Sequence, residues 1–565
     1  MRCVIGVTWF GTGGIHWLDE QQQTELYKDA VTMVQAGLSV VRLFVPAANL
    51  MEQRLPATID QVRAAVDAAQ AAGLSVIISA PTFWMNGMVL PPADPSGVAV
   101  FENEASLEQA EAMLRGLAAG LRDCSQALIY DLGDEIFHAR RSTNLPVVAV
   151  RRWFKRMTSA VRSQDPGAVV MQCHDAGWGT NAGRRWLLAA SPVDLIGVHA
   201  FPLWSPMRLE SHADRRATML LPFLVAVVAA WQRVVVDELT CYGAGEPETL
   251  RYARAVIPAC MARGAESVLW WCYKDIESRR PPYTGRPSET DRGLVRRDGT
   301  PRTVFETIRE LAAGELIAPR RATAALVLSE PSDERRSYLS PGPDPLEAEF
   351  TAHEVLTTAH IVHDVRRLNQ VDGYDFLVCP GMTDVSFETQ DILMRHVRDG
   401  GDLLVSLGGG AGGIPEELLD GLRCVDFRRD LSGVFRIGKD VAGEVSVPEL
   451  AVLEGDGWSS IAHVDNIPAM WYRTVGNGHI VVIPWWPEAT VGTSTLRVLY
   501  DVALARMGQR STWNLPDDVE VLAVSLNGRP AHLLINHDDA RAHELPGVEV
   551  PALGPRYTFV LEADA

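Results

Sequence analysis

The chain has 565 residues, too many for one hydrophobic core, and this length predicts two to four domains. Its formal net charge of −19 argues against nucleic acid as a partner, because such binding depends on clustered Lys and Arg. No stretch approaches the roughly 20 uninterrupted apolar residues of a membrane span, and the start of the chain reads as a strand rather than as a secretory signal. We therefore expect a cytoplasmic protein that binds neither membranes nor nucleic acid.

Eight cysteines are scattered through apolar segments, and no two of them form a C-x-x-C pair. This distribution favours reduced, mostly buried thiols over disulfides or a zinc site. The sequence therefore predicts neither a metal nor another cofactor.

Eight apolar runs rich in β-branched residues alternate with helical patterns in the first part of the chain, and a glycine closes several of these helices. The runs cover residues 3–8, 39–44, 75–80, 127–132, 169–173, 195–199, 233–237 and 267–272. Such alternation predicts a parallel sheet, and eight strands close it into a (β/α)8 barrel, which we place at residues 1–318. The alternative is an open doubly wound sheet, but the Gly11–Gly14 turn lacks the spacing of its phosphate-binding fingerprint.

Two of these strands run directly into carboxylates: the fourth into Asp134 and Glu135, and the seventh into Glu238. A single acid after a buried strand is commonly a helix N-cap or a salt-bridge partner. Two at the carboxyl ends of barrel strands lie on the rim where barrel enzymes collect their catalytic groups. Retaining glycosidases need one protonated carboxyl group and one carboxylate about 5–5.5 Å apart. The pair therefore predicts chemistry on a glycosidic bond, with Glu135 and Glu238 as the catalytic residues.

Other polar residues end neighbouring strands and are candidates for the same site. Arg42 ends the second strand, where it would hold Glu238 ionised, although an internal salt bridge without a catalytic role is the alternative. His199 ends the sixth strand and is either a substrate contact or a hydrogen-bonded core histidine. His174 and Asp175 end the fifth strand and are further candidates.

Tryptophans are frequent in the loops at this rim, and an indole stacks well on the apolar face of a sugar ring. We expect Trp9 and Trp270 to be platforms for the substrate, with Trp84 and Trp271 also in the binding site. Core packing is the alternative for each of them.

These strand ends resemble the clan A glycoside hydrolases, which are retaining (β/α)8 enzymes. The loop at 80–85 and its continuation at 90–97 are similar to a loop of the family 42 β-galactosidases, and residues 293–301 resemble the segment before the last barrel helix in many clan members. The resemblance implies that Glu135 is the acid/base and Glu238 the nucleophile. It places Arg42, His199 and either Trp270 or Trp271 in the substrate site.

Two residues depart from the pattern of the clan. Asp134 stands where the clan usually has an asparagine that binds the sugar 2-hydroxyl, and Phe201 stands where a tyrosine often contacts the nucleophile. An anionic Asp134 is expected to raise the pKa of Glu135 by repulsion between like charges. Both departures bear on which sugar is bound more than on the type of reaction.

The strand pattern restarts after residue 319, with runs at 323–329, 374–381 and 401–410 that have glycine-rich ends. They predict an open flavodoxin-like sheet over residues 319–510, which resembles the amidotransferase-like domain of the family 42 enzymes, a trimerisation module. Cys379 could be the nucleophile of an amidotransferase, but Pro380 fits the required tight turn poorly. Short strands at 519–528, 532–537 and 557–561 predict a small antiparallel β-domain over residues 511–565, similar to the C-terminal domain of that family.

The sequence thus predicts a retaining glycoside hydrolase, similar to β-galactosidases, that cleaves small β-linked oligosaccharides and forms a homo-oligomer, with a trimer favoured. Two alternatives remain open. One is a barrel that binds carbohydrate without cleaving it, and the other is glutaminase chemistry at Cys379.

Overall fold

The computed structural model describes residues 4–562 except 94–98, 125, 140–144, 206, 208, 210, 286, 316, 332–343, 384, 409–414, 416–417, 545–552 and 555. Residues 94–97 of the loop continuation at 90–97, and residues 409–410 of the run at 401–410, therefore lie outside the described residues. No helix among the described residues is long and apolar enough to cross a membrane.

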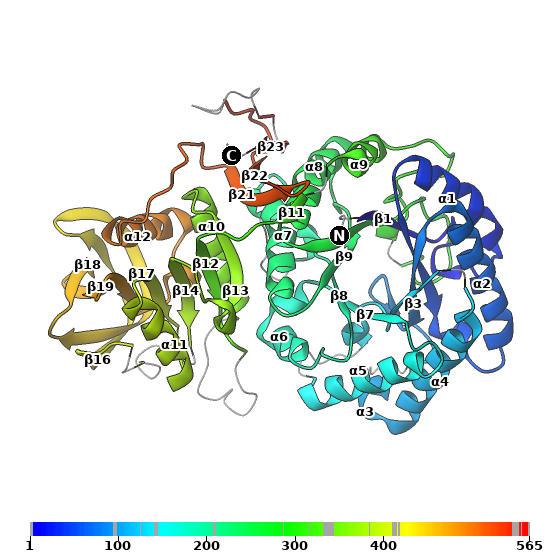
Figure 1. Ribbon diagram of the computed structural model, residues 1–565, viewed down its shortest axis with the longest axis horizontal. Helices are drawn as coiled ribbons and strands as arrows, with labels where there is room; N and C mark the ends of the chain where they lie inside the picture. The colour runs from blue at the N-terminus through cyan, green and yellow to red at the C-terminus, as the bar shows by residue number, and fades with distance from the viewer. Residues whose placement is uncertain are drawn as a thin grey trace. The chain divides into compact units, whose positions relative to one another are not determined.

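The first part of the chain is a closed barrel of eight parallel strands, as predicted (Figure 1). Around the barrel the order is β1, β10, β9, β8, β7, β6, β3 and β2. The strand bounds are β1 Val4–Trp9, β2 Val40–Pro46, β3 Ser75–Thr82, β6 Ile129–Asp131, β7 Val169–His174, β8 Leu195–Val198, β9 Val234–Leu239 and β10 Ala265–Trp270. All eight runs found in the sequence are strands of this barrel. The carboxyl ends of all eight therefore meet at one rim.

Helices follow the strands and cover the barrel on the outside, as Figure 1 shows for α1, α2, α4 and α5. The helices of the barrel are α1 Leu26–Gln35, α2 Leu55–Ala72, α3 Ala99–Glu102, α4 Glu104–Leu121, α5 Val147–Arg162, α6 Asn181–Leu187, α7 Arg215–Ala229, α8 Glu246–Ala262 and α9 Thr303–Ala313. A short hairpin, β4 Trp84–Met85 and β5 Met88–Val89, follows β3 at the rim.

Inside the barrel an apolar layer lies below a polar one. The apolar layer consists of Val40, Ile77, Met171, Cys173, Leu195, Val235 and Leu269. Side chains two positions apart on a strand face the same side, so the next inward residues on three of these strands are Arg42, Ser79 and Asp237. All three are fully buried, and Arg42 contacts both Ser79, at 2.7 Å, and Asp237, at 3.2 Å. The apolar floor thus supports a buried polar layer beneath the rim.

The part of the chain after the barrel contains a mixed sheet of nine strands in the order β13, β12, β14, β15, β20, β19, β18, β16 and β17. Its parallel strands are β12 Ala324–Leu328, β13 His363–Arg367, β14 Phe376–Met382, β15 Asp402–Leu407 and β20 Gly478–Ile483. Its helices are α10 Pro345–Thr358, α11 Phe387–Arg398 and α12 Thr493–Arg506. This parallel half confirms the predicted open α/β sheet.

The other half of this sheet is antiparallel and was not predicted. It consists of β16 Leu422–Ile437, β17 Asp440–Gly455, β18 Ser459–Val464 and β19 Ile467–Val475. Charged residues dominate the middle of β16, and most of its side chains there are exposed. A strand with solvent on both faces lacks the apolar alternation by which strands are recognised in a sequence.

The last strands are β21 Val519–Leu526, β22 Arg529–Asn536 and β23 Thr558–Glu562, which follow one another in one small sheet, and β11 Ile317–Pro319 is a further short strand. A turn at Asn527 and Gly528 joins β21 to β22. By their contacts the residues form two compact units, one of residues 1–319 with 525–529 and 556–558, and one of 320–524 with 530–555 and 559–565. The separate C-terminal domain at 511–565 stays a prediction.

Cys379 lies within β14 and is fully buried. Burial raises the pKa of its thiol, the opposite of what a nucleophilic cysteine needs. The structure therefore argues against amidotransferase chemistry at this residue. All seven cysteines in the described part of the chain are free thiols.

Candidate active site

A cavity of about 210 Å³ opens at the carboxyl ends of the barrel strands and contains both predicted catalytic residues. The side chains around it come from the loops after β3, β6, β7, β8, β9 and β10. Its carboxylates are Asp134, Glu135, Asp175, Glu238 and Glu289. Five carboxylates around so small a space require cations or shared protons beside them.

Arg42 supplies the central cation beneath the cavity. Its fully buried guanidinium contacts Asp131 at 2.8 Å and Asp134 at 2.7 Å through Nη2, and Asp237 at 3.2 Å and Glu238 at 3.0 Å through Nη1. A guanidinium presents its donors in a rigid planar fork, which suits carboxylates on two sides. The single positive charge is thus shared among four carboxylates.

The turn after β6 brings Asp134 and Glu135 to the rim. Gly133 has a φ of +105°, and a Cβ there would lie 2.6 Å from the carbonyl oxygen of Pro81. Glu135 itself has a φ of 45°, which is uncommon for a residue with a side chain. Unusual backbone of this kind persists where the surroundings enforce it, and it concentrates at functional sites.

His199 joins the two halves of the site. Its Nε2 lies 3.0 Å from Oε1 of Glu135, and its Nδ1 lies 3.3 Å from Asp237, on the Arg42 side. Burial lowers the pKa of His199, but the charges of Asp237 and Glu238 outweigh burial and raise it well above its ordinary value. The imidazolium therefore donates to both neighbours, and His199 is a positioning residue for Glu135.

The electrostatics of Glu238 differ from the expectation that Arg42 holds it ionised. Burial and the charge of Asp134 together outweigh Arg42 and His199, so the pKa of Glu238 lies well above its ordinary range. Burial likewise raises the pKa of Asp134 to about 7, against the effect of Arg42. One guanidinium cannot neutralise four buried carboxylates, so these carboxylates share a proton.

Glu135 is shifted in the other direction, contrary to the expectation that Asp134 raises its pKa. Burial raises the pKa of Glu135, but the hydrogen bond from His199 and the charge of His138 outweigh burial and bring it below its ordinary value. Asp134 lies against Arg42, and its charge acts strongly on Glu238. These shifts favour a proton near Glu238 and a carboxylate at Glu135.

Aromatic side chains form part of the cavity wall. Trp84, on β4, lies beside the ring of His138, with 5.4 Å between the ring centres. Trp204 and Tyr242 pack together with ring centres 4.4 Å apart, and Trp204 is 48% exposed. Trp271 donates from Nε1 to Glu289 at 2.6 Å. The structure therefore brings Trp84, Trp204 and Trp271 to the cavity.

Trp9 and Trp270 do not line this cavity, contrary to the prediction. Both are buried, and they belong to the outward-facing set of residues on β1 and β10. Trp9 donates from Nε1 to Asp29 of α1 at 2.8 Å, and Trp270 donates to the carbonyl of Arg292 at 3.3 Å. Their positions follow from the period of two along a strand, which sends Trp271 inward and Trp270 outward.

The residues of the wall that the sequence did not reveal include His138, Tyr242 and Glu289. Tyr242 donates to Glu289 Oε2 at 2.6 Å, and burial raises the pKa of Glu289. The ring of Tyr242 packs edge-to-face on Phe201, with ring centres 4.8 Å apart. The hydroxyl that Phe201 lacks is therefore present beside it, aimed at Glu289. The signal that could have found His138 and Tyr242 is their place three or four residues after Glu135 and Glu238.

Two groups of side chains around the cavity have the donors of a metal site. One is His138, His174 and Asp175, and the other is Asp134, His199, Asp237 and Glu238. The second group already has the Arg42 guanidinium in contact with its carboxylates. In the first group, hydrogen bonds and ion contacts join Asp175 to both histidines. Both groups are thus accounted for by contacts within the protein.

Comparisons with solved structures reveal the same fold, whereas no family model and no curated protein sequence matches the chain. The exo-beta-1,4-mannosidase Op5Man5 from Opitutaceae bacterium strain TAV5 matches with a TM-score of 0.78 and 22% identity, over 89% of this chain and 96% of that one. The beta-galactosidase from Bacillus circulans sp. alkalophilus matches with a TM-score of 0.73 and 13% identity, over 100% and 99%. A GH5_18 variant from Streptomyces cattleya in complex with Manb1-4GlcNAc matches with a TM-score of 0.57 and 20% identity, over 66% and 95%.

These matches confirm the expected fold, since structures of family 42 β-galactosidases superimpose on nearly the whole chain. The eight-stranded parallel barrel is part of the fold shared with these structures. At 13–22% identity the likeness concerns the fold.

Proposed function

We propose that the protein is a retaining β-glycosidase that removes a β-linked hexose by two displacements at one cavity. The observation that carries the proposal is the pair of carboxylates, Glu135 and Glu238, on the wall of the same small cavity, each held by its own cation, His199 and Arg42. Two carboxyl groups on one sugar site are the equipment of glycoside hydrolysis.

In the first displacement Glu238 attacks the anomeric carbon while Glu135, as a carboxylic acid, protonates the departing oxygen. In the second, Glu135 takes a proton from water, which attacks the anomeric carbon and releases Glu238. Glu238 must therefore give up its share of the buried proton before it attacks, and Asp134, with a pKa of about 7, is the neighbour able to take it. Arg42 remains bonded to both carboxylates throughout.

We propose a β-mannoside as the first substrate to test and a β-galactoside as the second. Support comes from the names of the matching structures, because the two described above at 20% identity or more are a β-1,4-mannosidase and a complex with Manb1-4GlcNAc. The β-galactosidases match at 13–16% identity. The aromatic walls at Trp84 and Trp204 suit the apolar faces of either sugar.

The experiment begins with aryl β-mannosides, β-galactosides and β-glucosides. The 2-deoxy-2-fluoro analogue of the sugar that is cleaved should then inactivate the enzyme and label Glu238, as read by mass spectrometry of its peptides. Glu135→Ala should lose about 100-fold or more on phenyl glycosides and much less on dinitrophenyl glycosides, whose leaving groups need no proton. A label on another residue, or a product of inverted configuration, would contradict the mechanism. Saturable sugar binding without hydrolysis would instead favour a carbohydrate-binding barrel.

A further inference from the structure

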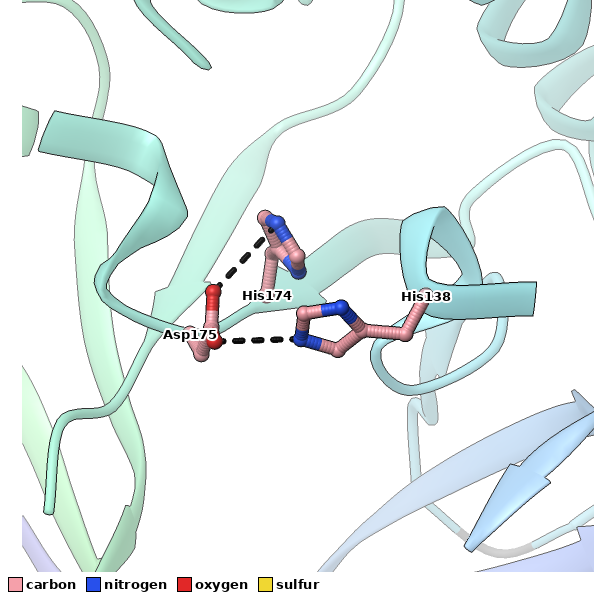
Figure 2. Close-up of side chains that lie close together, drawn as sticks. All are labelled: His138, His174 and Asp175. Atoms are coloured by element: carbon pink, nitrogen blue, oxygen red, sulfur yellow. Dashed lines mark hydrogen bonds and ion pairs between the residues drawn. The ribbon is translucent and has the colours of Figure 1, made fainter. Parts of the chain in front are cut away.

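Beside Glu135 the cavity contains a second histidine that the mechanism above does not use. His138 lies on the one-turn helix η4 (Ile136–Ala139), and a single atom, Nε2, lies 3.0 Å from Oδ2 of Asp175 and 3.7 Å from Oε1 of Glu135. Figure 2 shows His138 directed at one oxygen of Asp175 and His174 beside the other oxygen. One N–H of the imidazole thus lies between two carboxylates.

Asp175 is held in place as a carboxylate. Its Oδ1 accepts a hydrogen bond from the backbone N–H of Gly177 at 2.8 Å and lies 3.4 Å from Nε2 of His174 (Figure 2). Burial raises the pKa of Asp175, but the charges and hydrogen bonds of the neighbouring histidines outweigh burial and hold it well below its ordinary range. A Cβ at Gly177 would lie 2.6 Å from His174 Nε2, so the glycine leaves room for this arrangement.

The groups facing His138 come from three elements, and together they keep it protonated. Burial lowers its pKa, but Asp175 and Glu135 outweigh burial and the charge of His199, so that the pKa of His138 is about 9. His174, at the end of β7, is different, because burial lowers its pKa to about 4 and leaves it neutral. His138 therefore carries the mobile positive charge of this group.

The two imidazolium ions beside Glu135 differ in how easily each can release a proton. His199 is fully buried, and its second nitrogen contacts Asp237, so its charge is fixed in the protein. The side chain of His138 is 36% exposed, and its ring lies between Trp84 and His174 at the cavity wall. A proton can move from His138 to Glu135 and back, because the Asp175 carboxylate balances the positive charge of protonated His138.

We propose that the His138–Asp175 pair is the proton reservoir of Glu135, an assignment that rests on the proposed glycosidase function. When a sugar fills the cavity, the proton on His138 Nε2 moves to Glu135, which passes it to the glycosidic oxygen as the bond to the anomeric carbon breaks. The electron pair of that bond leaves with the oxygen, and Glu238 bonds to the carbon. In the second displacement the proton lost by water returns through Glu135 to His138. Hydrogen bonds that take part in catalysis commonly shorten when the substrate binds, so the 3.7 Å separation between Nε2 and Oε1 is compatible with this transfer.

If His138 is removed, a proton reservoir and a purely electrostatic role predict shifts of the alkaline limb of kcat/KM in opposite directions. If His138 only stabilises the Glu135 carboxylate, its removal raises the pKa of Glu135, and the alkaline limb of kcat/KM moves to higher pH. If His138 supplies the proton, the pKa of His138 sets the alkaline limb in the wild type. Removal of His138 then moves this limb down to the pKa of Glu135 alone.

The test compares His138→Gln with Asp175→Asn and with the control His16→Gln, a histidine outside the cavity whose ring contacts the carbonyl of Pro281. On a phenyl glycoside, His138→Gln should lower the alkaline limb by about one pH unit or more, and Asp175→Asn should lower it by less. The limb of His16→Gln should stay unchanged. On a dinitrophenyl glycoside, whose leaving group needs no proton, His138→Gln should lose less activity than on the phenyl glycoside. Circular dichroism checks the fold of each variant.

Titration of ¹³C-labelled histidines by NMR adds a readout that needs no substrate. The resonance lost in His138→Gln should titrate near pH 9 in the wild type, as the pKa of about 9 requires, and at lower pH in Asp175→Asn. Active enzyme whose alkaline limb rises in His138→Gln, or a His138 that titrates below pH 7, would overturn the reservoir and leave the glycosidase intact. Wild-type protein that cleaves no glycoside would overturn the proposed function, and the reservoir with it.

Discussion

At the scale of single residues, the main feature of the site is that it contains fewer cations than carboxylates. Arg42 contacts four carboxylates and His199 contacts two. The pKa of a carboxyl group in such a cluster depends on its neighbours more than on its own chemistry, so the protons titrate as a property of the whole cluster. A pH profile is therefore the measurement that reports most directly on this site.

The charge of Asp134 provides the sharpest test of this coupling. Asp134→Asn removes the negative charge that, after burial, does most to raise the pKa of Glu238. The nucleophile would then ionise at lower pH, and the acid limb of kcat/KM should move down by about one unit. The control is Glu289→Gln, which removes a cavity carboxylate bonded to Tyr242 and Trp271 rather than to Arg42. An acid limb that stays in place in Asp134→Asn would mean that Glu238 does not set it.

At the scale of elements, the turn after β6 determines where Glu135 lies. Gly133→Ala should lower the stability of the protein by about 1–2 kcal/mol, because a residue with a side chain is strained at a positive φ. The new Cβ would also approach the carbonyl oxygen of Pro81 to 2.6 Å and displace the turn. Displacement of Asp134 and Glu135 by a fraction of an ångström should lower kcat/KM by roughly 100-fold.

The chain offers a matched control at the C-terminus of α2. Gly73 has a φ of +103°, close to the +105° of Gly133, but a Cβ there would meet nothing within 4 Å. Gly73→Ala should therefore lose stability in a thermal melt with full activity, whereas Gly133→Ala should lose both. Equal activities in the two variants would show that the turn does not position the acid.

The same elements show what could be predicted from the sequence. The eight barrel strands were recognisable because each is buried on both faces and reads as a continuous apolar run, and the acids at their ends followed from the direction of a parallel sheet. The direction of a side chain was harder to assign, as Trp9 and Trp270 show, because a run without alternation hides which residues face inward. Glu289 could not be predicted, since it lies in a long loop after β10 with no periodic pattern.

At the scale of the whole molecule, the second unit presents an apolar surface with no assigned role. The long hairpin of β16 and β17 exposes Val425, Phe427 and Val441 by 43%, 45% and 61%. β17 is also the edge strand of its sheet, where backbone groups are open to pairing with another chain. Apolar side chains at an open edge favour association.

We therefore expect the protein to be a homo-oligomer, with a trimer favoured by the resemblance of this unit to a trimerisation module, and we expect the hairpin to lie in the interface. Light scattering at micromolar concentration should report more than one chain per particle. Phe427→Asp should shift the protein toward the monomer, because a charge buried in an apolar interface costs several kcal/mol. Phe387→Asp is the control, since Phe387 is 74% exposed and belongs to α11 rather than to the hairpin. A wild-type monomer would contradict the prediction, and an oligomer unaffected by Phe427→Asp would place the interface on another surface.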